Sequence, residues 1–307
     1  MTPDGRGASR PVLVMLAAGM AKRYGGCKPL APVGPHGEAV IDLTTSDALD
    51  AGFGHVVLVL GPHSGPAIEY HVERCWPRGV TVTAVEQTVP LGTAHAVLCA
   101  RDVVGRRPFG VVNADDVYGV GPLRQLAGAL AADGNDHVLV TFRLEDTVVS
   151  GDPVTRGTVE TTPDGKLRSM VERRKVTRLA DGTFAVGDGL DPAELAGTTP
   201  VSMNLWGFRP SIWHVFERAV RAEHPAVAPD GRVDPAEAGS DAEVLLPDVV
   251  GAMVRKGNKT EGGVEVLAAE GRCIGVTHAD DLQVARLELA ELVGRGERAE
   301  WPWESVR

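Results

Sequence analysis

The sequence predicts an α/β fold, with a Rossmann-like, mostly parallel sheet covered by helices, followed by a mixed-sheet region and a C-terminal cap. Up to about residue 145, short apolar runs bounded by turn residues alternate with helix-like stretches. This alternation is typical of a parallel sheet with helices on both faces. Beyond that point the chain is richer in Gly and Thr, and its pattern favours antiparallel strands.

The elements of the first region follow from the spacing of apolar residues. Short apolar runs flanked by turn residues predict buried strands, and helical apolar spacing that begins after Gly, Pro, Ser or Asp predicts helices. Each strand–helix–strand unit is expected to be right-handed. The predicted strands are residues 11–19, 55–61, 80–86, 109–116 and 137–143, and the predicted helices are residues 42–51, 64–76, 92–101 and 122–132.

The second region is expected to contain antiparallel strands at residues 157–165, 166–174 and 199–208. Residues 222–242, rich in Pro, Asp, Glu and Ala, predict a mobile or surface loop, and a helix is expected around residues 245–256. Two strands, 264–269 and 272–277, and a helix at 280–293 then close the chain. The tail WPWESV is expected to pack on its own domain or on a partner subunit.

The composition limits the possible functions. A chain of 307 residues, 43% hydrophobic and 23% charged, can bury a core without disulfides or metals. Its net charge of −10 argues against a nucleic-acid-binding surface, which needs clustered Lys and Arg. The four cysteines are far apart, and no apolar run approaches the roughly 18 residues of a membrane helix. These features predict a cytoplasmic protein with reduced thiols and with neither signal peptide nor membrane span.

The strongest motif is LAAGMAKRYGGCKP, residues 16–29, which directly follows the first predicted strand. Such a loop presents backbone N–H groups to phosphates, and its cations neutralise phosphate charge. An ordinary Gly-rich turn is the alternative, and neither the Walker pattern nor the dinucleotide fingerprint GxGxxG is matched. Arg23 and Lys28 are the predicted catalytic cations, and the remaining phosphate-loop contacts are assigned to Leu16, Ala17, Ala18, Gly19 and Lys22.

This loop resembles the opening signature LAxGxGTR…KP of the sugar-phosphate nucleotidylyltransferase family. It is most similar to a branch that reads LAAGMGSRYGGLK, continues with PVGPxGE and later carries NADDFYG; this chain has PVGPHGE at residues 32–38 and NADDVYG at residues 113–119. The resemblance implies the nucleotide-diphospho-sugar transferase fold and Mg²⁺-dependent transfer from a nucleoside triphosphate to a sugar phosphate, with release of pyrophosphate. Two residues depart from the pattern, since Ala21 replaces a Gly and Lys22 replaces a small hydroxyl residue.

A second motif, EQTVPLGTAHAV, covers residues 86–97. By resemblance, Gln87 and Gly92 contact the nucleobase, and Thr93 belongs to the same nucleotide-binding set. A side-chain amide offers both a donor and an acceptor, which suits the edge of a base. The alternative is a plain polar loop that enters a helix, and His95 is expected to be structural rather than a general base.

The third motif is VVNADDVYG, in which an apolar strand ends in the adjacent carboxylates Asp115 and Asp116. Open α/β sheets bind ligands at this edge, and carboxylates there can hold Mg²⁺ beside phosphate oxygens. By resemblance Asp115 is the metal ligand, which also places it against the nucleotide. Asp248 in AEVLLPDVV is the second expected ligand, with Glu243 in reserve. The alternative for the carboxylate pair is a cap on the following helix.

The remaining polar candidates lie in the second region. By resemblance, five residues match positions that contact the acceptor sugar or phosphate: Gly157, Glu160, Glu172, Arg174 and Asn204. Carboxylates and amides can bind hydroxyl groups, and a guanidinium can grip a phosphate. Each match is weak by itself, because exposed Glu and Arg on strands are usually solvated.

These motifs predict a nucleotide-binding half at residues 1–145, an acceptor-binding half of the same domain at 146–250, and C-terminal cap strands and a helix at 251–307. The chemistry could instead act on a non-sugar phosphate, such as a cyclitol, alcohol or cofactor-precursor phosphate. A non-catalytic nucleotide-binding regulator and a glycosyltransferase are further alternatives, and a homo-oligomer is possible. No HExxH or GxSxG motif supports a zinc or serine enzyme, and no hexapeptide repeats predict a C-terminal acetyltransferase.

Overall fold

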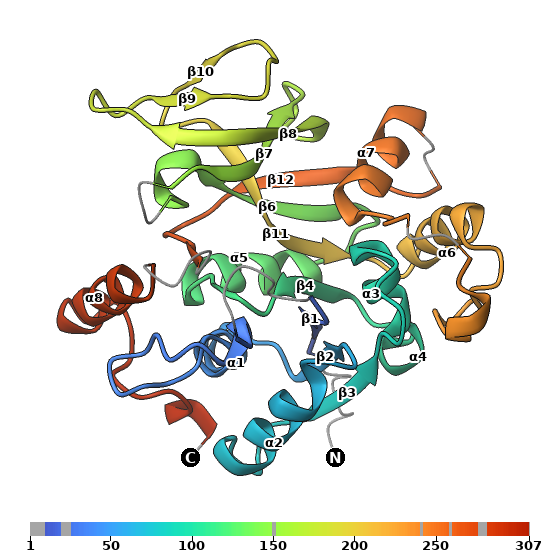
Figure 1. The fold of residues 1–307 in the computed structure, drawn as a ribbon, viewed down its shortest axis with the longest axis horizontal. Coiled ribbons are helices and arrows are strands. Elements are labelled where there is room, and N and C mark those ends of the chain that lie inside the picture. The colour runs from blue at the N-terminus through green and yellow to red at the C-terminus, as the bar shows by residue number, and fades with distance from the viewer. Residues whose placement is uncertain are drawn as a thin grey trace, which may run out of the picture.

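A computed structural model describes residues 10–19, 26–148, 152–239, 242–257, 260–275 and 281–306. Its central element is a sheet whose parallel part has the order β3-β2-β1-β4, in which β1 (Val12–Ala17) pairs with both β2 and β4 (Figure 1). Strands β2 (His55–Leu60), β3 (Val82–Glu86) and β4 (Phe109–Asn113) run in the same direction. The carboxyl ends of all four strands therefore meet at one edge of the sheet.

Strand β11 (Pro200–Phe208) joins this parallel part to the rest of the sheet. It runs antiparallel to β6 (His137–Arg143) along one side, and on its other side to β7 (Val154–Thr161) at residues 201–202 and to β4 at residues 206–208. An antiparallel series continues from β7 through β8 (Leu167–Arg178) and β9 (Phe184–Val186) to β10 (Glu194–Leu195). The predicted fold class, with a parallel core and a mixed-sheet region, is confirmed.

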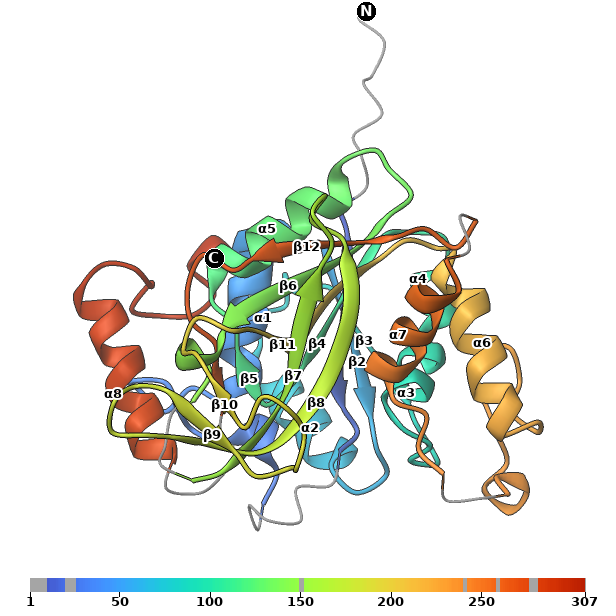
Figure 2. The ribbon, with the colours of Figure 1, turned by 90° about the horizontal axis from the view of Figure 1, so that it is seen from above.

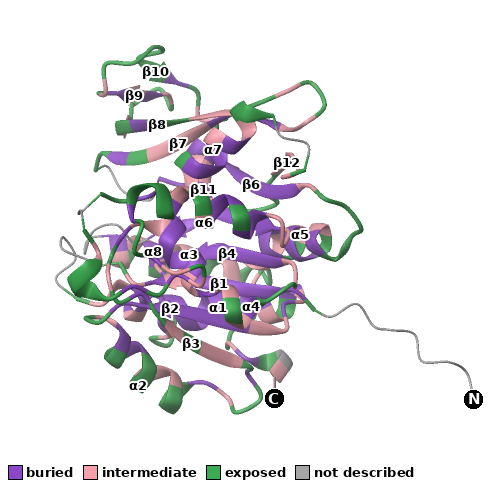
Figure 3. Ribbon diagram, turned by 90° about the vertical axis from the view of Figure 1, so that its right-hand side faces the viewer, coloured by how far each residue is buried: buried purple, intermediate pink, exposed green. Residues whose placement is uncertain are grey.

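Helices cover both faces of the sheet (Figure 2). The alternation along β1 decides which residue faces which layer, because successive side chains of a strand point to opposite faces. Val12 and Val14 pack with α3 (Thr93–Cys99), α6 (Ile212–Glu223) and α7 (Leu246–Lys256), whereas Leu13 and Met15 pack with α1 (Val40–Ala51) and α5 (Val120–Ala131). The central strands are accordingly buried on both sides (Figure 3).

The short and terminal elements differ in places from the prediction. The structure contains α2 (Gly65–Cys75) as expected, but a short α4 (Arg101–Val104) follows α3, and α6, β9 and β10 were not predicted. The residues of the third motif belong to two strands instead of one. β4 ends at Asn113, and β5 (Asp116–Val117) pairs with β13 (Ile274–Gly275) in a separate small sheet. Strand β12 (Val264–Ala268) runs parallel to β6 within the central sheet, so this part of the C-terminal segment is a sheet strand.

The C-terminal segment packs on its own domain, which is one of the two alternatives for the tail. After α8 (Asp281–Gly294), Arg298 forms a buried ion pair with Asp47 of α1 at 2.7 Å. Trp303 donates its backbone N–H to Ser46 Oγ at 2.9 Å, and its ring lies 5.4 Å from that of Trp76. Among the residues that the structure describes, no helix is both long and apolar enough to span a membrane.

Candidate active site

The first and third motifs meet at the carboxyl edge of the parallel strands. Leu16 pairs with Asn113 in the β1–β4 ladder, and the backbone N–H of Ala114 donates to Leu16 O at 3.0 Å. Lys28, at the start of a 3₁₀ turn (Lys28–Leu30), places its Nζ 3.9 Å from Asp115 Oδ2. Two residues that are 87 positions apart thus form one charged contact, as expected if both face a nucleotide phosphate.

The phosphate loop is only partly described. Leu16 and Ala17 close β1, and Ala18 and Gly19 follow it at the sheet edge. A Cβ at Gly61, which ends the neighbouring β2 segment, would lie 2.7 Å from Ala18 O, so the two chains approach closely there. Ala21, Lys22 and Arg23 lie outside the described residues, and their assigned roles stay predictions.

The base motif follows β3. The Gln87 side chain is buried, and its Nε2 donates to Gly92 O at 3.0 Å and to His95 Nδ1 at 3.1 Å. Gly92 has φ +98°, and a Cβ there would lie 2.5 Å from both Val244 N and Val244 O. Only Gly fits this position, because the conformation and the close approach both exclude a side chain.

Thr93 has a structural contact that the sequence did not indicate. Its Oγ1 accepts the backbone N–H of Leu246 at 2.8 Å, so it caps the first turn of α7 from another helix. Val244 also exchanges backbone hydrogen bonds with Leu91 and Ala94, at 2.8 and 3.0 Å. The base motif is thereby tied to the segment that carries Asp248.

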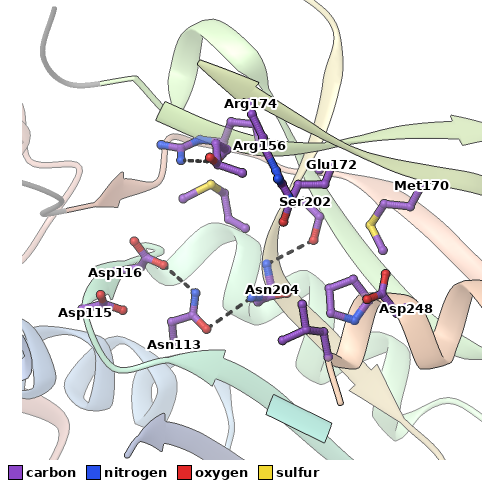
Figure 4. Close-up of a pocket in the computed structure, with 15 residues that line it drawn as sticks. Asn113, Asp115, Asp116, Arg156, Met170, Glu172, Arg174, Ser202, Asn204 and Asp248 are labelled. Atoms are coloured by element: carbon purple, nitrogen blue, oxygen red, sulfur yellow. Dashed lines mark hydrogen bonds and ion pairs between the residues drawn. The ribbon is translucent and has the colours of Figure 1, made fainter. Parts of the chain in front are cut away.

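A polar cavity of about 440 Å³ lies between this edge and the antiparallel strands (Figure 4). Its size is in the range of small-molecule sites. Of the predicted residues, it brings together Asp115, Gly157, Glu172, Arg174, Asn204 and Asp248. Its other lining residues are Asn113, Asp116, Thr155, Arg156, Met170, Ser202, Met203, Leu245 and Pro247.

Asn204 sits where strand β11 is irregular. The pairing of β11 with β6 shifts register between Ser202 and Leu205, and Asn204 has φ +58°, a conformation that Asn tolerates better than most residues. Its Nδ2 donates to Asn113 Oδ1 at 3.4 Å, and Asn113 Nδ2 donates to Asp116 Oδ2 at 2.9 Å. This chain of amides connects the strand bulge to the carboxylate pair (Figure 4).

The two adjacent aspartates differ in environment. Asp116 is buried, and loss of hydration together with the nearby Asp115 charge raises its pKa to about 7, although the Asn113 hydrogen bond and the Arg156 and Lys28 charges lower it. The pKa of Asp115 is raised by desolvation, while Lys28 opposes the shift. The Asp115 side chain is 37% exposed, so it is the carboxylate that a ligand can reach.

Arg156 is the functional candidate that sequence reasoning missed. It lines the cavity, and its guanidinium is anchored by donating to Thr147 Oγ1 at 3.1 Å and to Thr147 O at 2.5 Å. Its pKa is lowered first by burial, while the charges of Asp116 and Asp281 raise it. Its position immediately before Gly157 was the only available signal, and an Arg on a strand is normally solvated.

The alternation of side chains along β7 and β8 determines which of the acceptor candidates face the cavity. Gly157 pairs with Glu172 on one side and Ser202 on the other. Glu172 Oε1 accepts from Arg174 Nε at 2.7 Å, and the two residues face the cavity from positions two apart. Glu160 lies three residues beyond Gly157, accepts from Ser169 Oγ at 2.7 Å, and is not brought to the cavity.

The proposed metal ligands do not form a closed site. Asp115 and Asp248 lie on opposite sides of the cavity, with Asn113 and Asn204 between them (Figure 4). Over the described parts of the chain, no group of three or more His, Cys, Asp or Glu side chains is arranged to hold a metal ion. Glu243, the reserve ligand, does not line this cavity; it lines a separate groove between α6 and α7 that also includes Asp248.

Comparison with known proteins now identifies the fold and the motifs together. A model of the family described as "Nucleotidyl transferase" matches residues 14–221, which is more than half of the chain. This chain belongs to the nucleotidyl transferase family. The match begins inside β1 and includes the phosphate-loop, base and carboxylate motifs, so the family predicted from those motifs is confirmed.

Individual relatives of this nucleotidyl transferase match over shorter stretches. A UTP–glucose-1-phosphate uridylyltransferase from Klebsiella pneumoniae is 44% identical over 68 residues, covering 21% of this chain and 23% of that protein. The bifunctional protein GlmU of Sinorhizobium medicae (strain WSM419) is 31% identical over 194 residues, covering 61% of this chain and 41% of GlmU. The chain thus spans less than half the length of either relative.

Solved structures share the fold at low sequence identity. UDP-glucose pyrophosphorylase complexed with UDP-glucose superposes with a TM-score of 0.62 at 15% identity, covering 92% of this chain and 99% of that one. HddC from Yersinia pseudotuberculosis gives a TM-score of 0.58 at 15% identity, covering 91% and 99%. At these identities the likeness supports the fold of the nucleotidyl transferase and nothing finer.

Proposed function

We propose that this nucleotidyl transferase couples a nucleoside triphosphate to a sugar 1-phosphate and releases pyrophosphate. One observation carries the proposal: the Lys28–Asp115 contact of the phosphate loop borders a polar cavity of about 440 Å³. A nucleotide-binding edge and a sugar-sized pocket therefore share the carboxylate pair. The names of the relatives, which include UTP–glucose-1-phosphate uridylyltransferase, support this pairing of substrates.

The reaction needs no covalent enzyme intermediate. An oxygen of the acceptor phosphate attacks the α-phosphorus in line, the new P–O bond forms, and the bond to the bridging oxygen breaks as pyrophosphate leaves. Lys28 and Arg23 neutralise the charge that grows on the leaving group. Catalysis of this kind rests on positioning and electrostatic stabilisation.

The residues present fit a magnesium ion held by few protein ligands. Asp115 offers a reachable carboxylate that forms an ion pair with Lys28, while Asp116 accepts a hydrogen bond from Asn113. Mg²⁺ commonly binds one or two carboxylates together with waters and substrate phosphates, so a closed cage is not required. Bound there, the ion would neutralise phosphate charge. Asp115 is the proposed ligand, and Asp248 could contribute only if the two sides of the cavity approach each other.

The acceptor is proposed to bind among Gly157, Glu172, Arg174 and Asn204. Glu172 and Asn204 supply groups that can bind sugar hydroxyls, and Arg174 supplies a cation for the acceptor phosphate. A Cβ added at Gly157 would fit without a clash, in van der Waals contact with Met170 Sδ at 3.5 Å, and would take up space at the cavity wall. The division into a nucleotide half before residue 146 and an acceptor half up to residue 250 is part of this proposal.

A cytoplasmic location is also proposed, since nucleoside triphosphates are cytoplasmic substrates and all four cysteines are free thiols. A homo-oligomer remains compatible with the chain. The nucleobase and the acceptor are to be identified by experiment.

The test is pyrophosphate release with Mg²⁺, using ATP, GTP, CTP, UTP and dTTP in turn against sugar 1-phosphates, cyclitol phosphates and alcohol phosphates. Release that depends on a sugar 1-phosphate supports the proposal, whereas release only with cyclitol or alcohol phosphates replaces the acceptor class. Triphosphate binding by calorimetry without release from any acceptor would contradict the enzyme and favour a regulatory protein.

A further inference from the structure

Behind the base motif lies a buried chain of polar groups that the proposed reaction does not use. His95, on α3, is fully buried, and its Nε2 lies 2.8 Å from Gly231 O. Its Nδ1 lies 3.1 Å from Gln87 Nε2, which also lies 3.0 Å from Gly92 O. A histidine thus connects the base-reading glutamine to the distant loop that contains Gly231.

The carbonyl groups of Gly231 and Gly92 determine which nitrogen atoms of His95 and Gln87 must donate. A carbonyl can only accept, so His95 Nε2 must carry a proton to bond Gly231 O. Burial, the largest effect, lowers the pKa of His95 although the Gly231 and Val89 carbonyls raise it, which favours a neutral ring; with the proton on Nε2, Nδ1 accepts from the Gln87 amide. Gly92 O is likewise an acceptor. Both N–H bonds of the Gln87 amide are therefore directed into the protein, and the orientation of the amide follows from the network.

The opposite edge of the amide is left for a ligand. None of the described residues donates a hydrogen bond to Gln87 Oε1 or accepts one from the backbone N–H of Gly92. Reversing the amide would set Oε1 against Gly92 O and the lone pair of His95 Nδ1, which is unfavourable in a buried site. Gln87 is held in one of its two orientations.

We propose that His95 is a positioning residue that fixes the Gln87 amide, so that the base site presents an acceptor from Gln87 Oε1 beside a donor from Gly92 N–H. This inference rests on the proposed function, because it assigns a partner to the base contact. His95 does not touch the nucleotide and acts only through Gln87.

The loop that contains Gly231 packs closely against α3, the helix of His95. Gly231 has φ +86°, and a Cβ there would lie 2.8 Å from Cys99 N of α3. The turn is closed by bonds from Gly231 N to Ala228 O at 2.9 Å and from Ala228 N to Arg232 O at 2.8 Å. Most of the Pro- and Asp-rich loop is exposed as expected, and its turn at Gly231 packs behind the base motif.

Two substitutions of His95 test the roles of its two ring nitrogens separately. In His95→Asn the shorter amide can occupy the place of Nδ1 and still accept from Gln87, whereas in His95→Gln the longer amide reaches the place of Nε2 and bonds Gly231 but leaves Gln87 without that acceptor. Each variant loses one of two contacts, so their structural costs are matched. His137→Gln, which alters another buried histidine bonded on both sides, is the control.

The readout is the ratio of kcat/KM between the preferred triphosphate and the next best one, with the KM of the acceptor measured alongside. His95→Gln should lower this ratio about tenfold through the KM of the triphosphate. His95→Asn should keep it within about threefold, and His137→Gln should leave it unchanged. Equal losses in the two His95 variants, or an unchanged ratio in His95→Gln, would overturn the proposal.

A double-mutant cycle covers the case in which a variant is poorly folded. If His95 acts through Gln87, the effect of His95→Gln on selectivity must vanish in a Gln87→Leu background, and its persistence there would contradict the proposal. Absence of pyrophosphate release by the unaltered protein is a failure of the proposed function alone. Calorimetric dissociation constants for the five triphosphates, measured on the same proteins, then still test the role of His95.

Discussion

The proposed nucleotide half, residues 1–145, and the proposed acceptor half, residues 146–250, contribute residues to the same cavity in different ways. In the first, parallel strands end at one edge, so residues that follow neighbouring strands of the sheet come together; Lys28, after β1, and Asp115, after β4, are the example. In the second, antiparallel strands cross the cleft, and register decides which side chain faces it, as Glu172 and Glu160 show. A sequence motif is therefore sufficient to predict which residues meet at the site in the first half, but not in the second, where the strand register is also needed.

The largest effect is expected in the nucleotide half, from removal of Lys28. Lys28→Ala should lower kcat by about 10²–10³-fold, because a cation aimed at a developing phosphate charge acts mainly in the transition state. Steady-state pyrophosphate release measures it. Lys166→Ala, which removes a surface lysine paired with Asp136 at 3.0 Å, is the matched control. A loss below threefold in Lys28→Ala, or the same for Arg23→Ala, would remove that residue from the mechanism.

The second prediction concerns β6, which flanks the strand shared by both halves. Burial lowers the pKa of His137 to about 4 from an ordinary value of 6.5. Between these values the unfolded chain takes up a proton here and the folded chain does not, so stability present above pH 6.5 is lost as the pH falls toward 4, by roughly 3 kcal/mol. Urea unfolding across this range measures the slope, and His137→Gln should flatten it. An unchanged slope in the variant would exclude His137 as the cause.

Two glycines, Gly92 of the base motif and Gly157 of the cavity, allow a direct comparison of the halves. Gly92→Ala should lower the free energy of unfolding by about 2 kcal/mol, because an added Cβ meets the Val244 backbone at 2.5 Å and φ is +98°. Gly157→Ala should leave stability nearly unchanged but raise the KM of the acceptor, since its nearest contact is 3.5 Å away. Urea unfolding and acceptor kinetics test both. Equal destabilisation by the two changes would mean that the second half is as tightly packed as the first.

The smallest predicted effect tests whether the strand register of β7 and β8 determines which side chain contacts the acceptor. Glu172→Gln should lower kcat/KM for the acceptor about tenfold, because a carboxylate that binds a hydroxyl becomes an amide. Glu160→Gln should change it by less than about twofold, since this side chain bonds Ser169 away from the cavity. If the two variants ranked in the opposite order, the motif match would have located the acceptor better than the strand pairing.

The outcome for individual elements follows the same division. Hydrophobic runs predicted β1, β2, β4 and β6, because buried strands are continuous apolar segments, and alternating Val residues predicted β3, which lies at the edge of the sheet. Helix α6 was overlooked although its apolar residues, including Ile212, Trp213 and Phe216, are buried at helical spacing. β9 and β10 are too short to give a pattern, and β5 exists only because β13 pairs with it.

The sequence by itself determined the family, the parallel core and the order of the phosphate, base and carboxylate motifs, because each of these is encoded in contiguous residues and in strand ends that a parallel sheet must bring together. Only the tertiary structure decided that Arg156 lines the cavity, that Thr93 caps α7 and that His95 holds Gln87. The Thr93 contact depends on Leu246, 153 positions away, and the contacts of Arg156 and His95 depend on how the chain turns between partners nine and eight positions apart, which local spacing does not encode. The long loop shows both parts, because most of its residues are exposed as its composition predicts, while Gly231 packs against α3, which the composition did not indicate.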